Sequence, residues 1–312
     1  MLLFSIYVTP FIGQYDLRYP CQLQLQDPKI LGSIVVPFVA EFLSQQTFSK
    51  HIRELITART ARPLQAWDKK QLILPHCCKA SSLAPRICGS IAPDDANSLL
   101  KNADRAFAFG ADYVEIRFDF VNPDLLPEAL QAAKRVKDRA IFTMRSKIQG
   151  GVFARSERDR LQWLYRLAEE EPMLLDVELD TLQKNDDLAD FLERRRTPLL
   201  VSWHDFEKTP PRDSISDILS EMRTYSNYVK IVTTAHSIDD SMRLLELYET
   251  AIGLSPIFFA MGDAGVLSRL LCTIIGNAPF TYASLDKVLA PGQFNVQQMK
   301  KLYDKISGGS KV

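Results

Sequence analysis

The sequence lacks any excess of charge, because 38 basic residues balance 38 acidic ones. A chain without a basic surplus has no general attraction for nucleic acid or an anionic membrane, so we predict neither partner. It also has no apolar run near the roughly 18 residues of a membrane-spanning helix. Its first twelve residues lack the basic start and small-residue cleavage site of a signal peptide. A small metabolite is therefore the expected partner.

Cysteine is scarce, and its pattern indicates no pairing. The five cysteines are scattered, odd in number and without the paired spacings of a zinc site or a disulfide framework. This usage is typical of a reducing compartment, so we predict a cytoplasmic protein without a metal site.

Residues 1–85 mix short apolar pieces with glutamine, serine and proline and show no sustained period. We predict that they form an N-terminal extension separate from the main domain. Its apolar residues 34–43 either pack on that domain or form a helix in a poorly ordered segment. A start codon placed too far upstream is a third explanation.

From residue 86 onward, short apolar segments alternate with helical stretches of roughly 10 to 15 residues, the pattern of successive β-α units. We expect eight strands, at residues 86–90, 113–118, 140–144, 174–178, 199–202, 228–232, 257–260 and 280–283. Helices are expected to begin near residues 94, 124, 156, 181, 213, 237, 264 and 296. The fold class predicted for residues 86–312 is α/β, a (β/α)8 TIM barrel. An open doubly wound sheet is the alternative, but no Gly-x-Gly-x-x-Gly follows the first strand.

The expected strand at residues 228–232 carries a lysine, Lys230, among valine and isoleucine. Strands of a barrel are buried on both faces, so a cation in one of them is either expelled or used. Desolvation favours the neutral amine of a lysine, which can attack a ketone and form an imine. The alternative is a lysine whose stem follows the strand while its ammonium reaches water.

Polar residues also mark the ends of the other expected strands. Chemistry in such a barrel takes place at the C-terminal ends of the strands, so these residues are predicted to meet at one mouth. Singly, each has a structural explanation, such as an ion pair of Glu115 with Arg117 or a loop cap by His204. Together they indicate a site, because unpaired charges inside a barrel are costly. The residues expected at this mouth are Ser90, Glu115, Arg117, Arg145, Asp176, Glu178, Ser202, Trp203, His204, Asp205, Lys230, Met261 and Gly262.

These residues resemble the motifs of type I 3-dehydroquinate dehydratase, and the resemblance extends from residue 86 to the C-terminus. The motifs are Glu115-Ile116-Arg117-Phe118-Asp119, Thr143-Met144-Arg145 with Gly150-Gly151, Asp176-Val177-Glu178-Leu179, Ser202-Trp203-His204-Asp205, Val229-Lys230, Met261-Gly262 through Ser268-Arg269, and Ala290-Pro291-Gly292-Gln293. Members of this family are (β/α)8 barrels that dehydrate 3-dehydroquinate to 3-dehydroshikimate in the shikimate pathway of aromatic amino acid biosynthesis. The resemblance implies a lyase that needs no cofactor and forms a homodimer.

The resemblance also implies roles for individual residues. Lys230 would form the Schiff base and His204 would act as general acid and base. Arg269 would bind the substrate carboxylate, since a guanidinium fork suits two oxygens. The other expected substrate-binding residues are Ser90, Glu115, Arg117, Arg145, Gln149, Met261 and Gln293, with Gln293 closing over the site and Met261 packing beside the ring.

Two positions depart from the family pattern. Gln149 stands where a glutamate is usual, so the hydrogen-bonding reach is kept but a charge near His204 is lost. We expect retained activity with a shifted pH profile. Leu289 stands where a serine is common, which puts one hydroxyl contact to the substrate in doubt.

Two other functions remain alternatives at this point. A Schiff-base class I aldolase shares the barrel and the lysine, but usually needs a phosphate cradle, and Asp263 would repel a phosphate. A catalytically silent barrel that binds a metabolite, or a partner through residues 1–85, is favoured mildly by Gln149 and the extension. The presence of both Lys230 and His204 argues against it.

Overall fold

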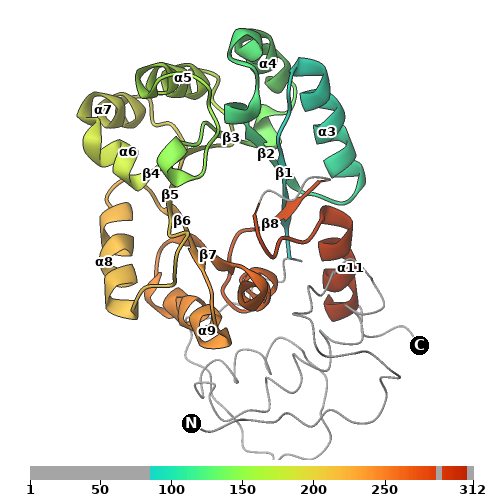
Figure 1. The fold of residues 1–312 in the computed structure, drawn as a ribbon, viewed down its shortest axis with the longest axis vertical. Helices are drawn as coiled ribbons and strands as arrows, with labels where there is room; N and C mark the ends of the chain where they lie inside the picture. The colour runs from blue at the N-terminus through green and yellow to red at the C-terminus, as the bar shows by residue number, and fades with distance from the viewer. Residues whose placement is uncertain (1–84, 286–289, 308–312) are drawn as a thin grey trace, which may run out of the picture. The chain divides into compact units, whose positions relative to one another are not determined.

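The computed structural model describes residues 85–285 and 290–307 (Figure 1). The predicted extension lies outside the described residues except for residue 85, and so does Leu289. Both of those expectations therefore stay predictions.

Eight parallel strands make one sheet in the order β7-β6-β5-β4-β3-β2-β1-β8. Figure 1 shows them arranged in a ring, with β7 and β8 on adjacent sides. The rings of Phe259 and Tyr282, from these two strands, lie 6.1 Å apart. The strands are β1 (Ile87–Ile91), β2 (Tyr113–Arg117), β3 (Ala140–Thr143), β4 (Leu174–Glu178), β5 (Leu199–His204), β6 (Tyr228–Thr234), β7 (Ser255–Met261) and β8 (Thr281–Ser284). The predicted (β/α)8 barrel is confirmed.

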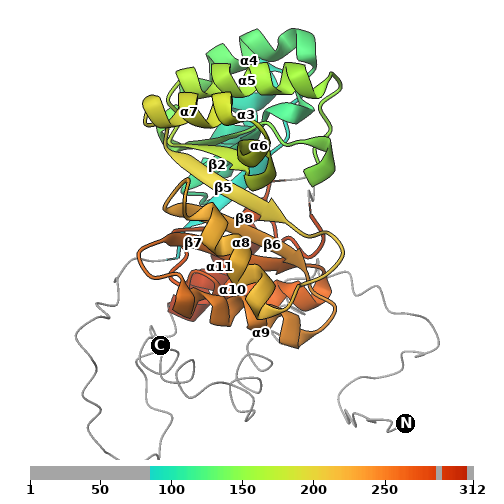
Figure 2. The ribbon, with the colours of Figure 1, turned by 90° about the vertical axis from the view of Figure 1, so that its left-hand side faces the viewer.

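Helices lie outside the ring of strands, and in the view of Figure 2 they lie above and below the strands. They are α3 (Ala96–Ala108), α4 (Leu126–Ala133), α5 (Glu157–Glu169), α6 (Leu179–Lys184), α7 (Asp186–Arg194), α8 (Arg212–Met222), α9 (Ile238–Leu247), α10 (Val266–Leu271) and α11 (Val296–Ser307). None of the helices in the described part of the chain is long and apolar enough to cross a membrane.

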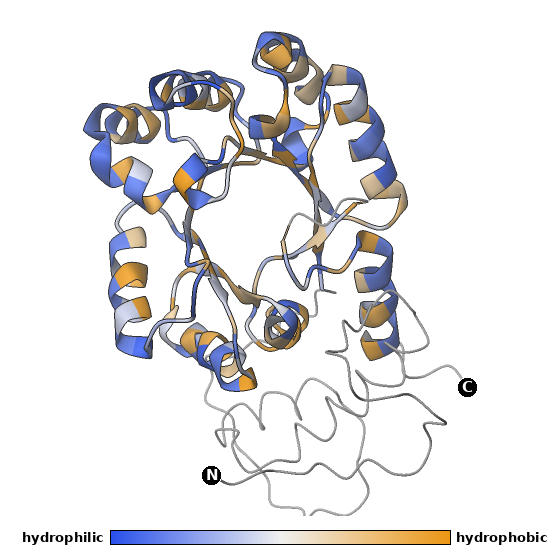
Figure 3. Ribbon diagram, viewed as in Figure 1, coloured by the Kyte–Doolittle hydropathy of each residue, from blue (hydrophilic) through white to orange (hydrophobic). Residues whose placement is uncertain are grey.

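Side-chain caps explain where several helices begin. Asp95, Ser156 and Ser237 each accept a hydrogen bond from the third backbone N–H of α3, α5 and α9, forming capping boxes. The helix expected near residue 181 is instead two short helices, α6 and α7, separated at Asn185, whose φ of −137° is not helical. Apolar residues concentrate on the helix faces toward the barrel (Figure 3).

Strand register brings the polar residues of neighbouring strands to the same level. Ser202 pairs with Lys230, and Thr143 pairs with Asp176. Because side chains alternate along a strand, Asp176 and Glu178 of β4 share one face of the sheet. Both are almost fully buried. The fold therefore collects charged side chains inside the C-terminal half of the barrel.

Candidate active site

A cavity of about 100 Å³ lies at the C-terminal ends of the strands. Every residue predicted to act in catalysis or substrate binding lines it: Ser90, Glu115, Arg117, Arg145, Gln149, His204, Lys230, Met261, Arg269 and Gln293. These residues come from β1, β2, β5, β6 and β7, from the loops after β3 and β8, and, for Arg269, from α10. The structure thus brings the predicted catalytic and substrate-binding residues together, while their individual roles stay predictions. Six other residues expected at the same mouth do not line this cavity: Asp176, Glu178, Ser202, Trp203, Asp205 and Gly262.

Lys230 sits on β6 with only 4% of its surface exposed. Its Nζ donates to Asp176 Oδ2 at 2.5 Å and lies 3.6 Å from Glu115 Oε1. The ammonium also lies over the ring of Tyr282, 4.7 Å from the centroid. The lysine is therefore retained inside the barrel by two carboxylates and an aromatic face, not directed outward to water.

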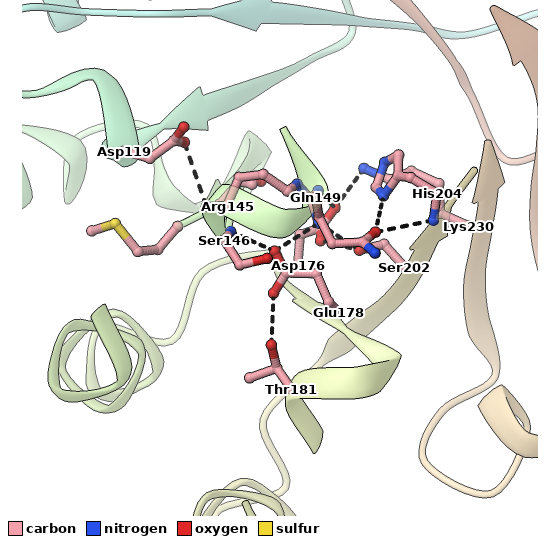
Figure 4. Close-up of polar contacts among 12 residues, drawn as sticks. Asp119, Arg145, Ser146, Gln149, Asp176, Glu178, Thr181, Ser202, His204 and Lys230 are labelled. Carbon is pink, nitrogen blue, oxygen red and sulfur yellow. Dashed lines mark hydrogen bonds and ion pairs between the residues drawn. The ribbon is translucent and has the colours of Figure 1, made fainter. Parts of the chain in front are cut away.

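Arg145 provides the second cation of this network (Figure 4). It contacts Asp176 at 2.8 Å and Glu178 at 3.2 Å, and donates to Ser202 Oγ at 2.7 Å. Burial alone would lower the pKa of Arg145, but the two carboxylates outweigh it and raise that pKa. Likewise burial would raise the pKa of Asp176, but Arg145 and Lys230 hold it well below its usual range.

Glu178 anchors the loop that follows β3. Its Oε1 accepts from the backbone N–H of Ser146 at 2.8 Å, and its Oε2 accepts from Arg160 at 3.2 Å and Thr181 at 3.1 Å (Figure 4). Burial disfavours the carboxylate, yet Arg145 and Arg160 lower the pKa of Glu178 overall. Glu178 therefore stays ionised and ties this loop to β4.

His204 ends β5 and is oriented by Gln149. The backbone N–H of His204 donates to Gln149 Oε1 at 3.1 Å, and the ring Nδ1 lies 3.0 Å from the same oxygen. Since a backbone N–H can only donate, the facing atom must be the amide oxygen, and Nδ1 must then carry the ring proton. Nε2 is left with its lone pair, as a general base requires.

The pKa of His204 is well below its ordinary value. Burial is the largest cause, and the charges of Arg145 and Lys230 add to it. The ring of Phe206 stacks on the imidazole, with centroids 5.8 Å apart and planes 12° from parallel. A neutral imidazole held in one orientation is suited to accept a proton.

Two glycines shape the loop that carries Gln149. Gly150 has a φ of +79°, and a Cβ on Gly151 would lie 2.0 Å from the carbonyl oxygen of Arg145. The N–H of Gly151 donates to Ser146 O at 2.7 Å, which closes the turn. Glycine is thus required at both positions for the loop to present Gln149 to His204.

Glu115 and Arg117, adjacent on the inward face of β2, are each held by other partners. Glu115 accepts from Ser90 Oγ at 2.9 Å and Thr143 Oγ1 at 3.2 Å. Arg117 makes a two-point contact with Asp119, at 2.8 and 2.7 Å. The ion pair of Glu115 with Arg117 that was considered from the sequence is not formed, because each has its own partners.

Arg269 differs from the other cations of the site. It is 1% exposed, yet its Nε and Nη2 have no hydrogen-bond partner among the described residues. Its guanidinium lies 4.2 Å from the centroid of the Phe259 ring. Burial lowers the pKa of Arg269 to about 10. A buried guanidinium with free donors is suited to bind an anion.

Several residues of the site were not assigned a role from the sequence. Asp176 and Glu178 were noted at a strand end, but their ion pairs with Arg145 depend on the pairing of strands. Phe206, Phe259 and Tyr282 complete the cavity wall. For Tyr282, only the alternation of side chains along its strand could have indicated that it faces the cavity. Among residues 85–285 and 290–307, no three His, Cys, Asp or Glu side chains are grouped to hold a metal ion.

Fold and site together define a (β/α)8 barrel with a buried lysine, an oriented histidine and a buried arginine in one cavity at the C-terminal ends of the strands. The family model for type I 3-dehydroquinase matches residues 87–310. The chain belongs to the type I 3-dehydroquinase family.

Individual relatives agree with this assignment. A 3-dehydroquinate dehydratase of Thermococcus gammatolerans is 38% identical over 200 residues, covering 64% of this chain and 89% of the relative. One from Dehalococcoides mccartyi is 34% identical over 239 residues, covering 75% and 96%. Among solved structures, the 3-dehydroquinate dehydratase of Aquifex aeolicus is similar, with 30% identity, a TM-score of 0.59 and coverage of 70% of this chain and 98% of that one.

A second similar solved structure contains a small molecule. It is a type I 3-dehydroquinate dehydratase of Clostridium difficile with covalently modified comenic acid. It is 25% identical, with a TM-score of 0.64, and covers 73% of this chain and 94% of that one.

Proposed function

We propose that this chain dehydrates 3-dehydroquinate to 3-dehydroshikimate through an imine on Lys230, with His204 as general acid and base. The observation that carries the proposal is the pairing, in one cavity, of a buried lysine with a histidine whose Nε2 is free of its proton. The chain is accordingly a hydro-lyase of the shikimate pathway, like its relatives.

Imine formation begins at Lys230. The Lys230 ammonium first gives up one proton, and neutral Nζ attacks the ketone carbon. The carbonyl oxygen then leaves as water, carrying that proton and a second one from Nζ. The resulting iminium carries its positive charge on the same nitrogen that the ammonium occupied. Asp176, 2.5 Å from Nζ, and Glu115 therefore stabilise the charge both before and after the bond forms.

Elimination follows at the neighbouring carbons. His204 Nε2 takes a proton from the carbon next to the iminium, and the electron pair of that C–H bond forms the enamine. The enamine then expels the β-hydroxyl, which leaves as water with the proton from the imidazolium. Water hydrolyses the conjugated iminium, so Lys230 is restored and the enone product is released.

The other polar residues of the cavity are assigned to substrate binding, except that Arg145 is assigned mainly to positioning Asp176. Arg269 is proposed to bind the carboxylate, because two of its donors have no partner within the described residues. Gln293, Ser90, Glu115 and Arg117 are proposed to contact hydroxyls. Arg145 is engaged by Asp176, Glu178 and Ser202, so we assign it chiefly to positioning Asp176.

A class I aldolase is the competing Schiff-base reaction, and the site does not favour it. Among the described residues, the buried cationic donors without a partner belong to one guanidinium, that of Arg269, which suits a carboxylate. A homodimer and a cytoplasmic location remain predictions from the sequence. Sedimentation of the purified protein tests the first of these.

The direct test of function mixes purified protein with 3-dehydroquinate and follows the ultraviolet absorbance of the conjugated enone. Absorbance should rise with the native protein and not with Lys230→Ala. Lys101→Ala is the matched control, because Lys101 is an exposed lysine of α3. Equal activity in Lys230→Ala would overturn the imine mechanism, and no activity in the native protein would overturn the dehydratase assignment.

A further inference from the structure

A second cavity lies outside the barrel, behind the loop that follows β3. Its volume is about 490 Å³, within the range of roughly 300–1,000 Å³ typical of small-molecule sites. The walls come from that loop, from the start of α5 and from α6. None of its lining residues belongs to the catalytic cavity.

The walls combine an apolar surface with polar atoms that have no partner. Phe153 is buried, and Ile148 is 78% exposed beside the cavity, with Leu161 contributing from α5. Ser146 is 6% exposed, and its Oγ has no hydrogen-bond partner among the described residues. A buried hydroxyl and an open apolar wall at one cavity are both costly without an occupant.

The charges around this cavity favour an occupant with an anionic group. Glu157 is paired with Arg160 at 2.6 Å, and Asp180 contacts Lys184 at 3.4 Å through Oδ2. Lys147 has no ion-pair partner within the described part of the chain. The Lys147 ammonium and the Ser146 hydroxyl are therefore available to a carboxylate.

The cavity wall also contains an acceptor atom for a positively charged group, the carboxylate oxygen Oδ1 of Asp180. The Oδ1 atom of Asp180 is buried and has no hydrogen-bond partner in residues 85–285 and 290–307. An occupant that donates to this oxygen would satisfy it. An ammonium group suits it best, because the acceptor belongs to a carboxylate.

We propose that this cavity binds a free amino acid with a large apolar side chain. Its carboxylate would meet Lys147 and Ser146, its ammonium would meet Asp180, and its side chain would pack against Phe153 and Leu161. The cavity residues Lys147 and Ile148 directly precede Gln149, the residue that orients His204, in one short turn, Lys147–Gln149 (Figure 4). Occupancy is therefore expected to alter the setting of His204.

Binding is tested by calorimetry on the full chain with L-phenylalanine as the probe. We expect saturable binding tighter than about 10 mM. L-phenylalaninamide, which lacks the carboxylate, and 3-phenylpropionate, which lacks the ammonium, should each bind about tenfold more weakly. No saturable binding of L-phenylalanine would overturn the proposal. Equal affinity for the amide or for 3-phenylpropionate would overturn the contact assigned to the missing group.

Variants locate the site. Lys147→Met should weaken binding about tenfold, and Leu161→Trp should abolish it by filling the cavity. Lys101→Met, at an exposed lysine of α3, is the control and should bind as the native chain does. Thermal melts verify that each variant folds. Unchanged affinity in both Lys147→Met and Leu161→Trp would place any binding elsewhere and overturn the proposal.

The effect on His204 rests on the proposed function, whereas binding does not. Saturating L-phenylalanine should shift the pH profile of kcat in the native chain and leave it unchanged in Leu161→Trp. A chain that binds the probe but has no dehydratase activity would refute only the proposed function. An active chain that does not bind it would refute only this inference.

Discussion

The two sides of the catalytic cavity are built in opposite ways. On the side of β3 to β6, Arg145, Asp176, Ser202 and Lys230 satisfy one another through contacts of 2.5 to 2.8 Å. On the side of β7 and β8, two donor atoms of Arg269 have no hydrogen-bond partner among the described residues. The hydroxyl of Tyr282 also has no partner among them. One side is complete in the free protein and the other is not.

This difference indicates how the work is divided. A satisfied network fixes its members in place before the substrate arrives, which is what the reacting lysine requires. An unsatisfied buried donor costs about 1–3 kcal/mol in the free protein, and a ligand that pairs with it recovers that cost. In the proposed mechanism the complete side holds the reacting lysine in place, and the incomplete side binds the substrate carboxylate.

The largest expected effect comes from removing the base. His204→Ala should lower kcat by about 10²- to 10⁴-fold, because no other oriented group takes the proton. Imine formation on Lys230 should persist, since Asp176 and Glu115 remain. Reduction with borohydride followed by mass measurement checks this. A kcat within threefold of the native value would exclude His204 as the base.

Matched variants on the two sides test the comparison itself. Arg145→Met should destabilise the fold by about 3–5 kcal/mol, because Asp176 and Glu178 would be left as uncompensated buried charges. Arg269→Met should leave stability unchanged or slightly higher, since it removes a buried charge without a partner. Urea unfolding of both variants measures the difference. Equal destabilisation would show that the two sides are not distinct.

Arg269→Met, which is expected to change stability little, should have the larger effect on substrate binding. Arg269→Met should raise KM for 3-dehydroquinate about 10- to 100-fold, because a charge-assisted hydrogen bond is worth roughly 1.5–3 kcal/mol. Arg269→Lys should recover part of the loss by keeping the charge. Steady-state kinetics at fixed pH provide the measurement, and an unchanged KM in Arg269→Met would place the carboxylate elsewhere.

The smallest expected effect concerns the pH profile. His204 must be neutral to act as base, so activity is lost as pH falls through its pKa, which lies well below the ordinary value. Gln149→Glu places a negative charge beside the imidazole and should raise that pKa. The acid limb of kcat should therefore move to higher pH. An acid limb that stays in place, or moves to lower pH, contradicts this reading of Gln149.

The sequence predicted the barrel well because its signals are local. Each expected strand lies within a few residues of an observed one, and Ser156 and Ser237 marked where α5 and α9 begin. For α3 the expected start, residue 94, lies one residue before the observed cap, Asp95. The break between α6 and α7 was not predicted, because it depends on the backbone at Asn185. Leu289 and the extension lie outside the described residues.

The sequence predicted which residues line the site, but not the hydrogen bonds and ion pairs among them. Alternation along each strand and the barrel topology were enough to bring Lys230 and His204 to one mouth, whereas Arg269, on α10, was placed there only by the family resemblance. The choice of partners was beyond reach, since Arg145 bonds to Asp176, Glu178 and Ser202 across neighbouring strands. Nor could a sequence show that Arg269 would be left without a partner.

The central claim is that Lys230 forms an imine with the substrate. The most direct measurement incubates the protein with 3-dehydroquinate, reduces with borohydride and maps the modified peptide by mass spectrometry. The account predicts one added ligand per chain, attached at Lys230 and absent from Lys230→Ala. Turnover without any trapped adduct, or an adduct at another lysine, would contradict it.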